Sequence, residues 1–191
     1  MCWEMPSLKE HLRKAAGVAA RGGWTEEDTK IKLVVPLLIA IGIDVFSPEA
    51  ACWETPCRAD AAFDGALILE TKPFGHKIEN RGGIISLDPN ANGADDLGQI
   101  CAYCHNWNNG KPPFALPPLA AMTNGKCWHV FWAGKLAELA EAETKARPAG
   151  MAMATVGCER AAVDGSPFDI IDDENRLSEK TLNRLTAVLR R

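Results

Sequence analysis

Apolar residues recur at helical spacing in the N-terminal part of the chain. The segment 7–20 (SLKEHLRKAAGVAA) is predicted to be a helix that ends at Arg21-Gly22-Gly23. A second helix is predicted from Thr25, an N-cap with an acid three residues later, to about Ile41. Pro36 lies within this second helix and removes a backbone donor, so we expect a kink or a break there.

The middle of the chain carries strand patterns. Asp44-Val45-Phe46 is a short strand candidate, and a proline-containing loop follows it. Residues 58–63 (RADAAF) and 66–72 (ALILETK) flank Asp64-Gly65, a pair of residues typical of a tight turn. We therefore expect a β-hairpin across these two runs.

The second half alternates helix and strand patterns without an internal repeat. We expect a helix at 93–107, strands at 117–122 and 127–132 joined by Thr123-Asn124-Gly125, and a helix at 135–146. A less regular section, 147–175, precedes a basic C-terminal helix near 178–190. The order of elements predicts an α/β or α+β domain with a mixed sheet.

Length and composition favour a globular, cytoplasmic protein. The 191 residues are most simply one domain, with 47% hydrophobic and 24% charged residues. No secretory signal and no apolar run long enough to span a bilayer is present, so we expect no membrane association. The net charge of −4 gives no global attraction to nucleic acid, and any such function must depend on a local site.

Cys101-Ala102-Tyr103-Cys104-His105 matches the pattern for c-type haem attachment. We expect no haem, because that chemistry belongs to exported proteins, and the seven cysteines indicate reduced thiols. Zinc shared with Cys52 and Cys57 is an alternative that we do not favour, because the two cysteine pairs lie far apart and the first is loosely spaced. Packing is the preferred role for the cysteines.

The strongest candidate chemistry lies at Asp60, Glu70 and Lys72. Two carboxylates supply hard oxygen ligands for Mg²⁺, and a lysine can orient or help deprotonate a water while offsetting phosphate charge. Glu70 emerges at the end of a nearly all-apolar strand, where a charge is unusual. The alternative is an ordinary strand-end acid and a solvent-facing Glu-Thr-Lys charge pair.

The hairpin register decides whether Asp60 joins Glu70. A two-residue loop would place the two acids on opposite faces of the sheet. We instead predict a three-residue loop, Phe63-Asp64-Gly65, which pairs Ala62 with Ala66 and Asp60 with Ile68, or a bulge with the same effect. The two acids then become diagonal neighbours about 7 Å apart on one face, with Gly65 at the left-handed third loop position.

The order of several motifs resembles the PD-(D/E)xK nuclease superfamily. These motifs are Thr25-Glu26-Glu27-Asp28-Thr29-Lys30, Pro36-Leu37-Leu38 with Gly42, Arg58-x-Asp60, Leu69-Glu70-Thr71-Lys72, Gln99-x-x-x-Tyr103 and Thr123-Asn124-Gly125 before Trp128. More narrowly, the chain is similar to the N-terminal nuclease domain of type I restriction enzyme R subunits. The resemblance covers about residues 24–132, between the N-terminal helix 7–20 and a C-terminal extension, 134–191.

The resemblance implies a restriction-endonuclease-like core, with a catalytic hairpin and flanking helices, that hydrolyses DNA. Asp60 and Glu70 match the metal-binding acids, and Lys72 matches the catalytic lysine. Glu26 matches a helix glutamate near the metal, although a first-turn acid favoured by the helix dipole is an equal alternative. Gln99 and Tyr103 match a glutamine-tyrosine motif that supports the site. The expected cofactor is Mg²⁺, with Mn²⁺ as a substitute.

Two departures shape the expected function. Ala59 replaces the proline of the superfamily pattern, at a position that supplies no ligand. The chain has no phosphate loop for an ATP-driven motor, so specificity is expected from a partner subunit, a homodimer, or DNA structure and ends. Lys77 and Arg81 are candidates for phosphate contact. A restriction, defence or mobile-element setting is expected, and a catalytically inactive binding module of the same fold is the alternative.

Overall fold

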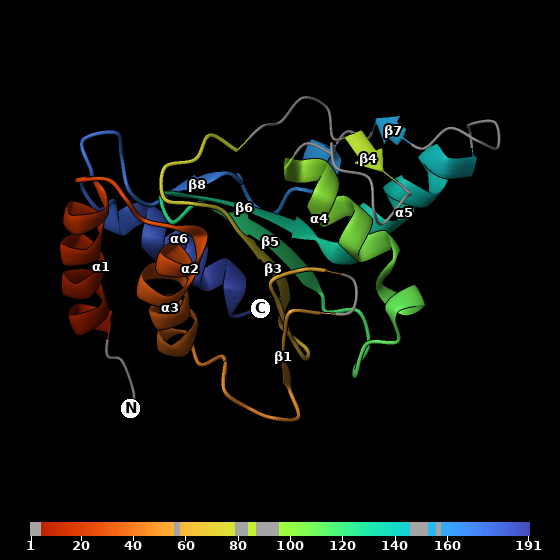
Figure 1. Cartoon of the computed structure of the whole chain (residues 1–191), viewed down its shortest axis with the longest axis horizontal. Coiled ribbons are helices and arrows are strands. Elements are labelled where there is room, and N and C mark those ends of the chain that lie inside the picture. The colour runs from red at the N-terminus through yellow and green to blue at the C-terminus, as the bar shows by residue number, and fades with distance from the viewer. Residues whose placement is uncertain (1–4, 56–57, 79–83, 87–95, 146–152, 156–157) are drawn as a thin grey trace.

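A mixed sheet with helices on both faces forms the frame of the protein (Figure 1). A computed structural model describes residues 5–55, 58–78, 84–86, 96–145, 153–155 and 158–191. Within these residues six strands lie in the order β1-β2-β3-β5-β6-β8. Strands β3 and β5 are parallel, and the other neighbours in this sheet are antiparallel. The predicted α/β class with a mixed sheet is therefore confirmed.

The strands are short. They span β1 (Ala51–Trp53), β2 (Ala61–Phe63), β3 (Leu67–Thr71), β5 (Leu119–Thr123), β6 (Cys127–Trp132) and β8 (Phe168–Asp169). A separate antiparallel ribbon pairs β4 (Ile84–Ser86) with β7 (Met153–Thr155). Every residue of β3 and β5 is buried, as expected for a parallel pair covered on both faces.

The helices divide between the two faces of the sheet. They are α1 (Met5–Ala19), α2 (Glu26–Thr29), the π-helical η1 (Lys30–Val34), α3 (Val35–Ala40), α4 (Asp96–His105), α5 (Ala133–Lys145) and α6 (Glu179–Leu189), with 3₁₀ turns η2 (Trp107–Gly110) and η3 (Cys158–Ala161). Helices α1, α3 and α6 cover one face, and α4 and α5 cover the other (Figure 1).

Each face of the sheet has its own apolar core. The first core joins Leu12 of α1, Leu38 of α3 and Leu185 of α6 to the odd-numbered residues of β2, β3 and β5. The second core joins Ile100 of α4 and Leu136 of α5 to the even-numbered residues of the same strands. The strand alternation thus sends successive side chains of β3 into different cores.

The kink or break predicted at Pro36 is not a break: the helix continues from Glu26 to Ala40, and its irregularity is the π-helical segment just before Pro36. The backbone N–H of Val35 bonds the carbonyl of Lys30, five residues earlier, before α3 begins. Proline cannot donate to the carbonyl of Lys32, four residues before it. The imidazole of His11 on α1 lies 2.7 Å from that carbonyl and satisfies it instead.

The prediction of a strand at Asp44-Val45-Phe46 is wrong. The segment is a turn, in which the Asp44 carboxylate accepts the backbone N–H of Phe46 at 3.1 Å. Such a local side-chain bond competes with strand pairing. The edge strand β1 lies a few residues later, within the segment that was predicted to be a loop.

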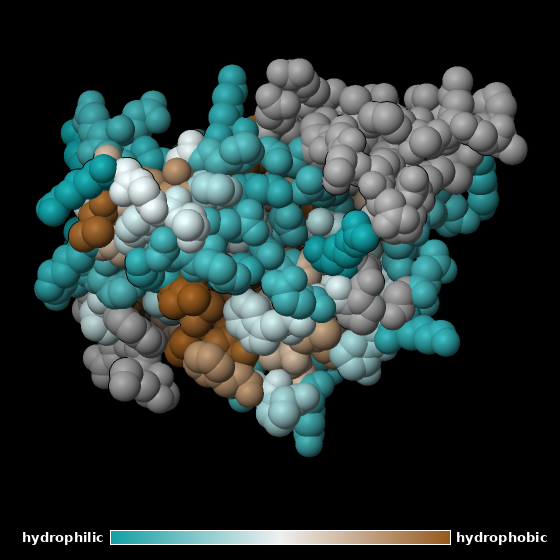
Figure 2. All heavy atoms as spheres, in the orientation of Figure 1, coloured by the Kyte–Doolittle hydropathy of each residue, from teal (hydrophilic) through white to brown (hydrophobic). Residues whose placement is uncertain are grey.

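Hydrophilic residues cover most of the face seen in Figure 2, and an apolar patch lies beside α3. Among the described residues, the exposed large apolar side chains are Val18, Ile31, Phe46 and Trp53. None of the described helices combines the length and the apolar character needed to cross a membrane.

Candidate functional site

Strand β3 carries the first two candidate residues to the edge of the second core. Glu70 is 6% exposed and follows Ile68 on the face covered by α4. Lys72 lies just beyond the strand, and its Nζ donates to Glu70 Oε1 at 2.9 Å. The two charges therefore form a nearly buried ion pair, so the solvent-facing interpretation of this triplet is wrong.

The hairpin brings Asp60 next to this pair, although the predicted register is wrong. Phe63 pairs with Leu67 and Ala61 with Leu69, so the loop is Asp64-Gly65-Ala66. Gly65 takes φ +64° at the second loop position, where the left-handed conformation suits glycine. Continuing this register places Asp60 opposite Glu70.

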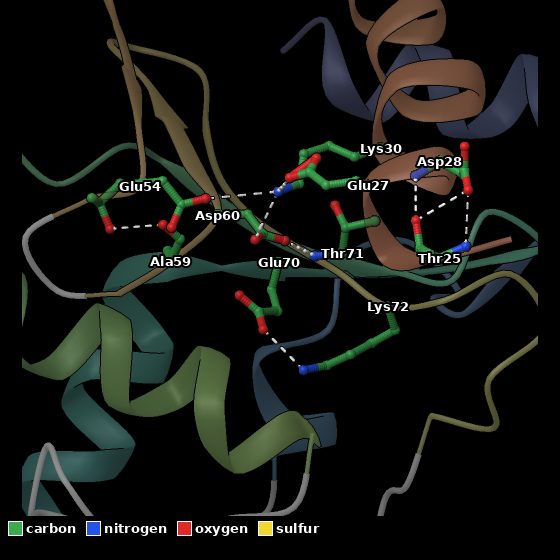
Figure 3. Close-up of polar contacts among 11 residues, drawn as sticks. Thr25, Glu27, Asp28, Lys30, Glu54, Ala59, Asp60, Glu70, Thr71 and Lys72 are labelled. Atoms are coloured by element: carbon green, nitrogen blue, oxygen red, sulfur yellow. Dashed lines mark hydrogen bonds and ion pairs between the residues drawn. The ribbon is translucent and has the colours of Figure 1, made fainter.

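The register differs from the predicted one by two residues, and this preserves the face of every side chain. Asp60 is 8% exposed, and its Oδ2 accepts the backbone N–H of Thr71 at 2.6 Å. Figure 3 shows the Asp60 carboxylate turned toward Lys30 and the Glu70 carboxylate turned toward Lys72. The hairpin thus juxtaposes two acids, each paired with its own lysine.

Lys30 is the partner of Asp60. It was not among the predicted site residues. Its Nζ donates to Asp60 Oδ1 at 3.0 Å and to Glu27 Oε1 at 2.8 Å. The lysine side chain is only 5% exposed. Its one sequence signal was the i, i+3 spacing from Glu27, which is common on helix surfaces. Lys30 lies where α2 passes into the π-helical segment.

The start of α2 is fixed by local chemistry. The Thr25 hydroxyl accepts the backbone N–H of Asp28, and the Asp28 carboxylate accepts the backbone N–H of Thr25, each at 3.1 Å (Figure 3). The predicted capping box is therefore confirmed. Glu26 lies in the first turn of α2, directly after the N-cap.

The carboxylates influence one another electrostatically. Burial raises the pKa of Glu70 to about 7, with Lys72 opposing the rise and the charges of Asp60 and Glu26 adding to it. Burial and the neighbouring Asp60 charge also raise the pKa of Glu26 above its ordinary value. Glu26 therefore interacts electrostatically with Asp60 and Glu70.

Helix α4 supplies a further hydrogen-bond partner of Lys72, the side chain of Gln99. Gln99 Oε1 accepts a hydrogen bond from Lys72 Nζ at 2.7 Å. Burial by itself would lower the pKa of Lys72, but the nearby carboxylates, with Glu70 first, raise it above its ordinary value. Lys72 is therefore positively charged at neutral pH.

Two further residues near Lys72 were not predicted. Asp96, the first residue of α4, has Oδ1 3.9 Å from Lys72 Nζ and Oδ2 2.9 Å from His76 Nε2. Asn124 donates from its side-chain amide to the carbonyl of His76 at 2.6 Å, which fixes the loop after β3. Asn124 belongs to the predicted turn Thr123-Asn124-Gly125, but its contact with His76 was not predictable, because the loop and the turn meet only in the folded chain.

The other residues that were predicted to support the site or contact phosphate lie in different surroundings. Tyr103 lies on α4 and packs against the second core. Lys77 is exposed in the loop after β3, and Arg81 lies outside the described residues. The turn Thr123-Asn124-Gly125 is confirmed between β5 and β6, where Gly125 takes φ +80° and a Cβ would lie 2.8 Å from Leu33.

The cysteines of the haem-like pattern are packing residues. Cys101 and Cys104 are buried in the second core, as predicted, together with Cys158. Cys101 Sγ lies 3.7 Å from the carbonyl of Leu136 and 3.9 Å from Cys158 Sγ. Cys57, one of the alternative zinc ligands, lies outside the described residues.

The donor chemistry of the site fits Mg²⁺. Asp60, Glu70 and Glu26 offer carboxylate oxygens. Their negative charges repel one another, and a divalent cation bound between them would reduce this repulsion. The buried hydroxyl of Thr71, beside Asp60, has no hydrogen-bond partner and would be satisfied by a solvent molecule. Within the part of the chain that the structure describes, no three His, Cys, Asp or Glu side chains are arranged as a complete metal site. Water and substrate oxygens would have to complete the shell, as is common for Mg²⁺.

Comparisons with known proteins give no further guidance: no family model, no curated protein and no solved structure matches the chain.

Proposed function

We propose that the protein is a metal-dependent nuclease of the PD-(D/E)xK type that hydrolyses phosphodiester bonds, with DNA as the substrate. One observation carries the proposal. Asp60 Oδ2 accepts the backbone N–H of Thr71, the residue between Glu70 and Lys72, and Gln99 on α4 bonds Lys72. The mixed sheet with helices on both faces supports a restriction-endonuclease-like core.

In this proposal Asp60 and Glu70 hold Mg²⁺ or Mn²⁺, with Glu26 as an additional ligand. A bound divalent cation would polarise the phosphate and lower the pKa of a coordinated water. The protein contributes the position of the acids, which the Thr71 backbone N–H and Lys72 restrain. Burial of both acids excludes bulk water and strengthens their interaction with charge.

Lys72 acts as an ammonium donor in this mechanism. Because the pKa of Lys72 is raised, the side chain favours orienting the attacking water and offsetting phosphate charge over removing a proton. Gln99 holds the Nζ atom from the other side of the site. Lys77, exposed in the following loop, is proposed to contact the phosphate backbone. Sequence specificity would come from a second copy or a partner subunit.

Cleavage of plasmid and linear DNA with Mg²⁺ or Mn²⁺ tests the proposal. We expect wild-type cleavage, and losses of at least roughly a hundredfold in Asp60→Ala and Lys72→Ala, because each removes charge from the reacting centre. Lys14→Ala is the matched control, since Lys14 is exposed on α1 and pairs with Glu10 in the same helix. Equal activity in wild type and both site variants, or none with varied DNA, contradicts the proposal.

A catalytically inactive nucleic-acid-binding module is the second candidate. The observation that favours it is that each Asp60 oxygen already accepts a hydrogen bond, one from Lys30 and one from Thr71. Steeply salt-dependent DNA binding without hydrolysis under any metal condition would support this function instead.

A further inference from the structure

Lys30 is placed to affect cation binding at the acid pair. Its ammonium group contacts Asp60 and Glu27 directly, and Glu54 Oε1 lies 3.9 Å away (Figure 3). The three carboxylates differ in their dependence on this contact. The side chains of Glu27 and Glu54 are 61% and 81% exposed, whereas that of Asp60 is 11% exposed. Without Lys30, water would solvate the two glutamates but would reach little of Asp60.

Asp60 Oδ1 is also the oxygen best placed to accept a metal. The other oxygen, Oδ2, is held by the Thr71 backbone N–H at 2.6 Å, in a bond that fixes the carboxylate to the strand. A divalent cation at Asp60 and Glu70 would therefore share Oδ1 with the Lys30 ammonium. Two cations at one oxygen repel each other, and this repulsion opposes metal binding.

Lys30 has a second partner, Glu27, that can keep its ammonium group paired when Asp60 accepts a cation. Glu27, one turn earlier on the same helix, binds Nζ at 2.8 Å and can keep the ammonium group paired while the contact with Asp60 lengthens. We propose that Lys30 is a resident counter-ion of Asp60, which stabilises the acid pair without metal and competes with a divalent cation for Asp60. This inference rests on the proposed metal site at Asp60 and Glu70.

The alternative role for Lys30 is a brace that orients Asp60 for the metal. Partners of this kind raise metal affinity, and their loss weakens binding by roughly 10-fold to 100-fold. A competitor has the opposite effect. Taking a doubly charged ion about 5 Å from Nζ and the dielectric constant of water, loss of the lysine charge should tighten binding by at least about tenfold. The sign of the change separates the two roles.

Titration with Mn²⁺ alone, after dialysis against a chelator, measures this sign without DNA. We expect Lys30→Met and Lys30→Gln to bind Mn²⁺ about tenfold more tightly than wild type. Lys30→Arg keeps the charge and should retain wild-type affinity. Lys32→Met is the matched control, because Lys32 lies on the same helical segment, is 49% exposed and pairs with Asp28 instead. Lys30→Gln, which keeps polar contacts, decides the result if Lys30→Met does not fold.

Unchanged or weaker Mn²⁺ binding in Lys30→Gln overturns the competitor role. The proposed function fails separately, and this inference with it, if wild type binds no Mn²⁺ or binds it equally well after Asp60→Ala. Wild-type binding that requires Asp60, combined with unchanged affinity in the Lys30 variants, overturns the competitor role alone. The midpoint of thermal unfolding gives a second readout, since Mn²⁺ should raise it more in Lys30→Gln than in wild type.

Discussion

Replacement of Glu70 by glutamine should change how the stability of the protein depends on pH. In the folded chain burial raises the pKa of Glu70 to about 7, from an ordinary value of 4.5 in the unfolded chain. Between these two values the folded state binds a proton that the unfolded state has lost. The contribution of Glu70 to stability is therefore complete at low pH and is lost as the pH rises through 7.

The size of this effect follows from the shift. Each pKa unit corresponds to about 1.4 kcal/mol, so raising the pKa of Glu70 from 4.5 to about 7 amounts to roughly 3 kcal/mol in total. Between about pH 5 and about pH 8 the wild-type free energy of unfolding should fall by about 2 to 3 kcal/mol through Glu70 alone. Glu70→Gln has no such ionisation, and its stability should fall less over this range.

Urea denaturation in chelator at several pH values measures this difference. Glu10→Gln is a control, because Glu10 is exposed on α1 and the hydrogen bond from Lys14 lowers its pKa below the ordinary value. Its pH profile should parallel that of wild type. If Glu70→Gln and wild type lose stability equally between pH 5 and pH 8, Glu70 is not a buried acid of raised pKa, and the electrostatic argument for a cation site is refuted.

Two further outcomes follow from single contacts. Gln99→Ala removes the 2.7 Å bond to Lys72 Nζ, and we expect DNA cleavage to fall by roughly 10-fold to 100-fold, as for other partners that orient a reacting group. Unchanged cleavage rates would show that Gln99 does not position Lys72. His11→Ala leaves the Lys32 carbonyl below Pro36 without its bond, and urea denaturation should show a loss of about 1 kcal/mol. His11→Phe, which keeps an aromatic ring without the donor, should lose a similar amount, and a wild-type midpoint in His11→Phe would contradict this explanation.

The hairpin shows which part of the fold the sequence could predict. Asp64-Gly65 identified the turn, and the length of the apolar run identified a buried strand. The register was not predictable, because β3 is buried on both faces and its continuous apolar run has no alternation to distinguish one pairing from another. A register error of one residue would exchange the two faces of the sheet, whereas the actual error of two residues preserved the face of each paired side chain.

The edge strand β1 was predicted less well than the hairpin. Val45 and Phe46 have the composition of a strand, whereas the segment from Pro48 to Pro56 that contains Trp53 favours a loop through its prolines. The Asp44 carboxylate nevertheless bonds the N–H of Phe46 and makes a turn, while β1 forms because β2 offers it a partner. Strand pairing depends on a distant segment, which local propensity does not reveal.

The two lysines that pair with the buried acids also differ in how far the sequence could predict them. Two buried acids at one end of a hairpin require positive partners, because an unpaired buried carboxylate is costly. Lys72 could be predicted because it follows Glu70 on the same strand face. Lys30 could not, because its spacing from Glu27 is that of an ordinary helix surface pair, and its burial beside Asp60 arises only when α2 and η1 pack against the hairpin. Burial of an acid therefore predicts that a cation is present, but the fold decides which lysine supplies it.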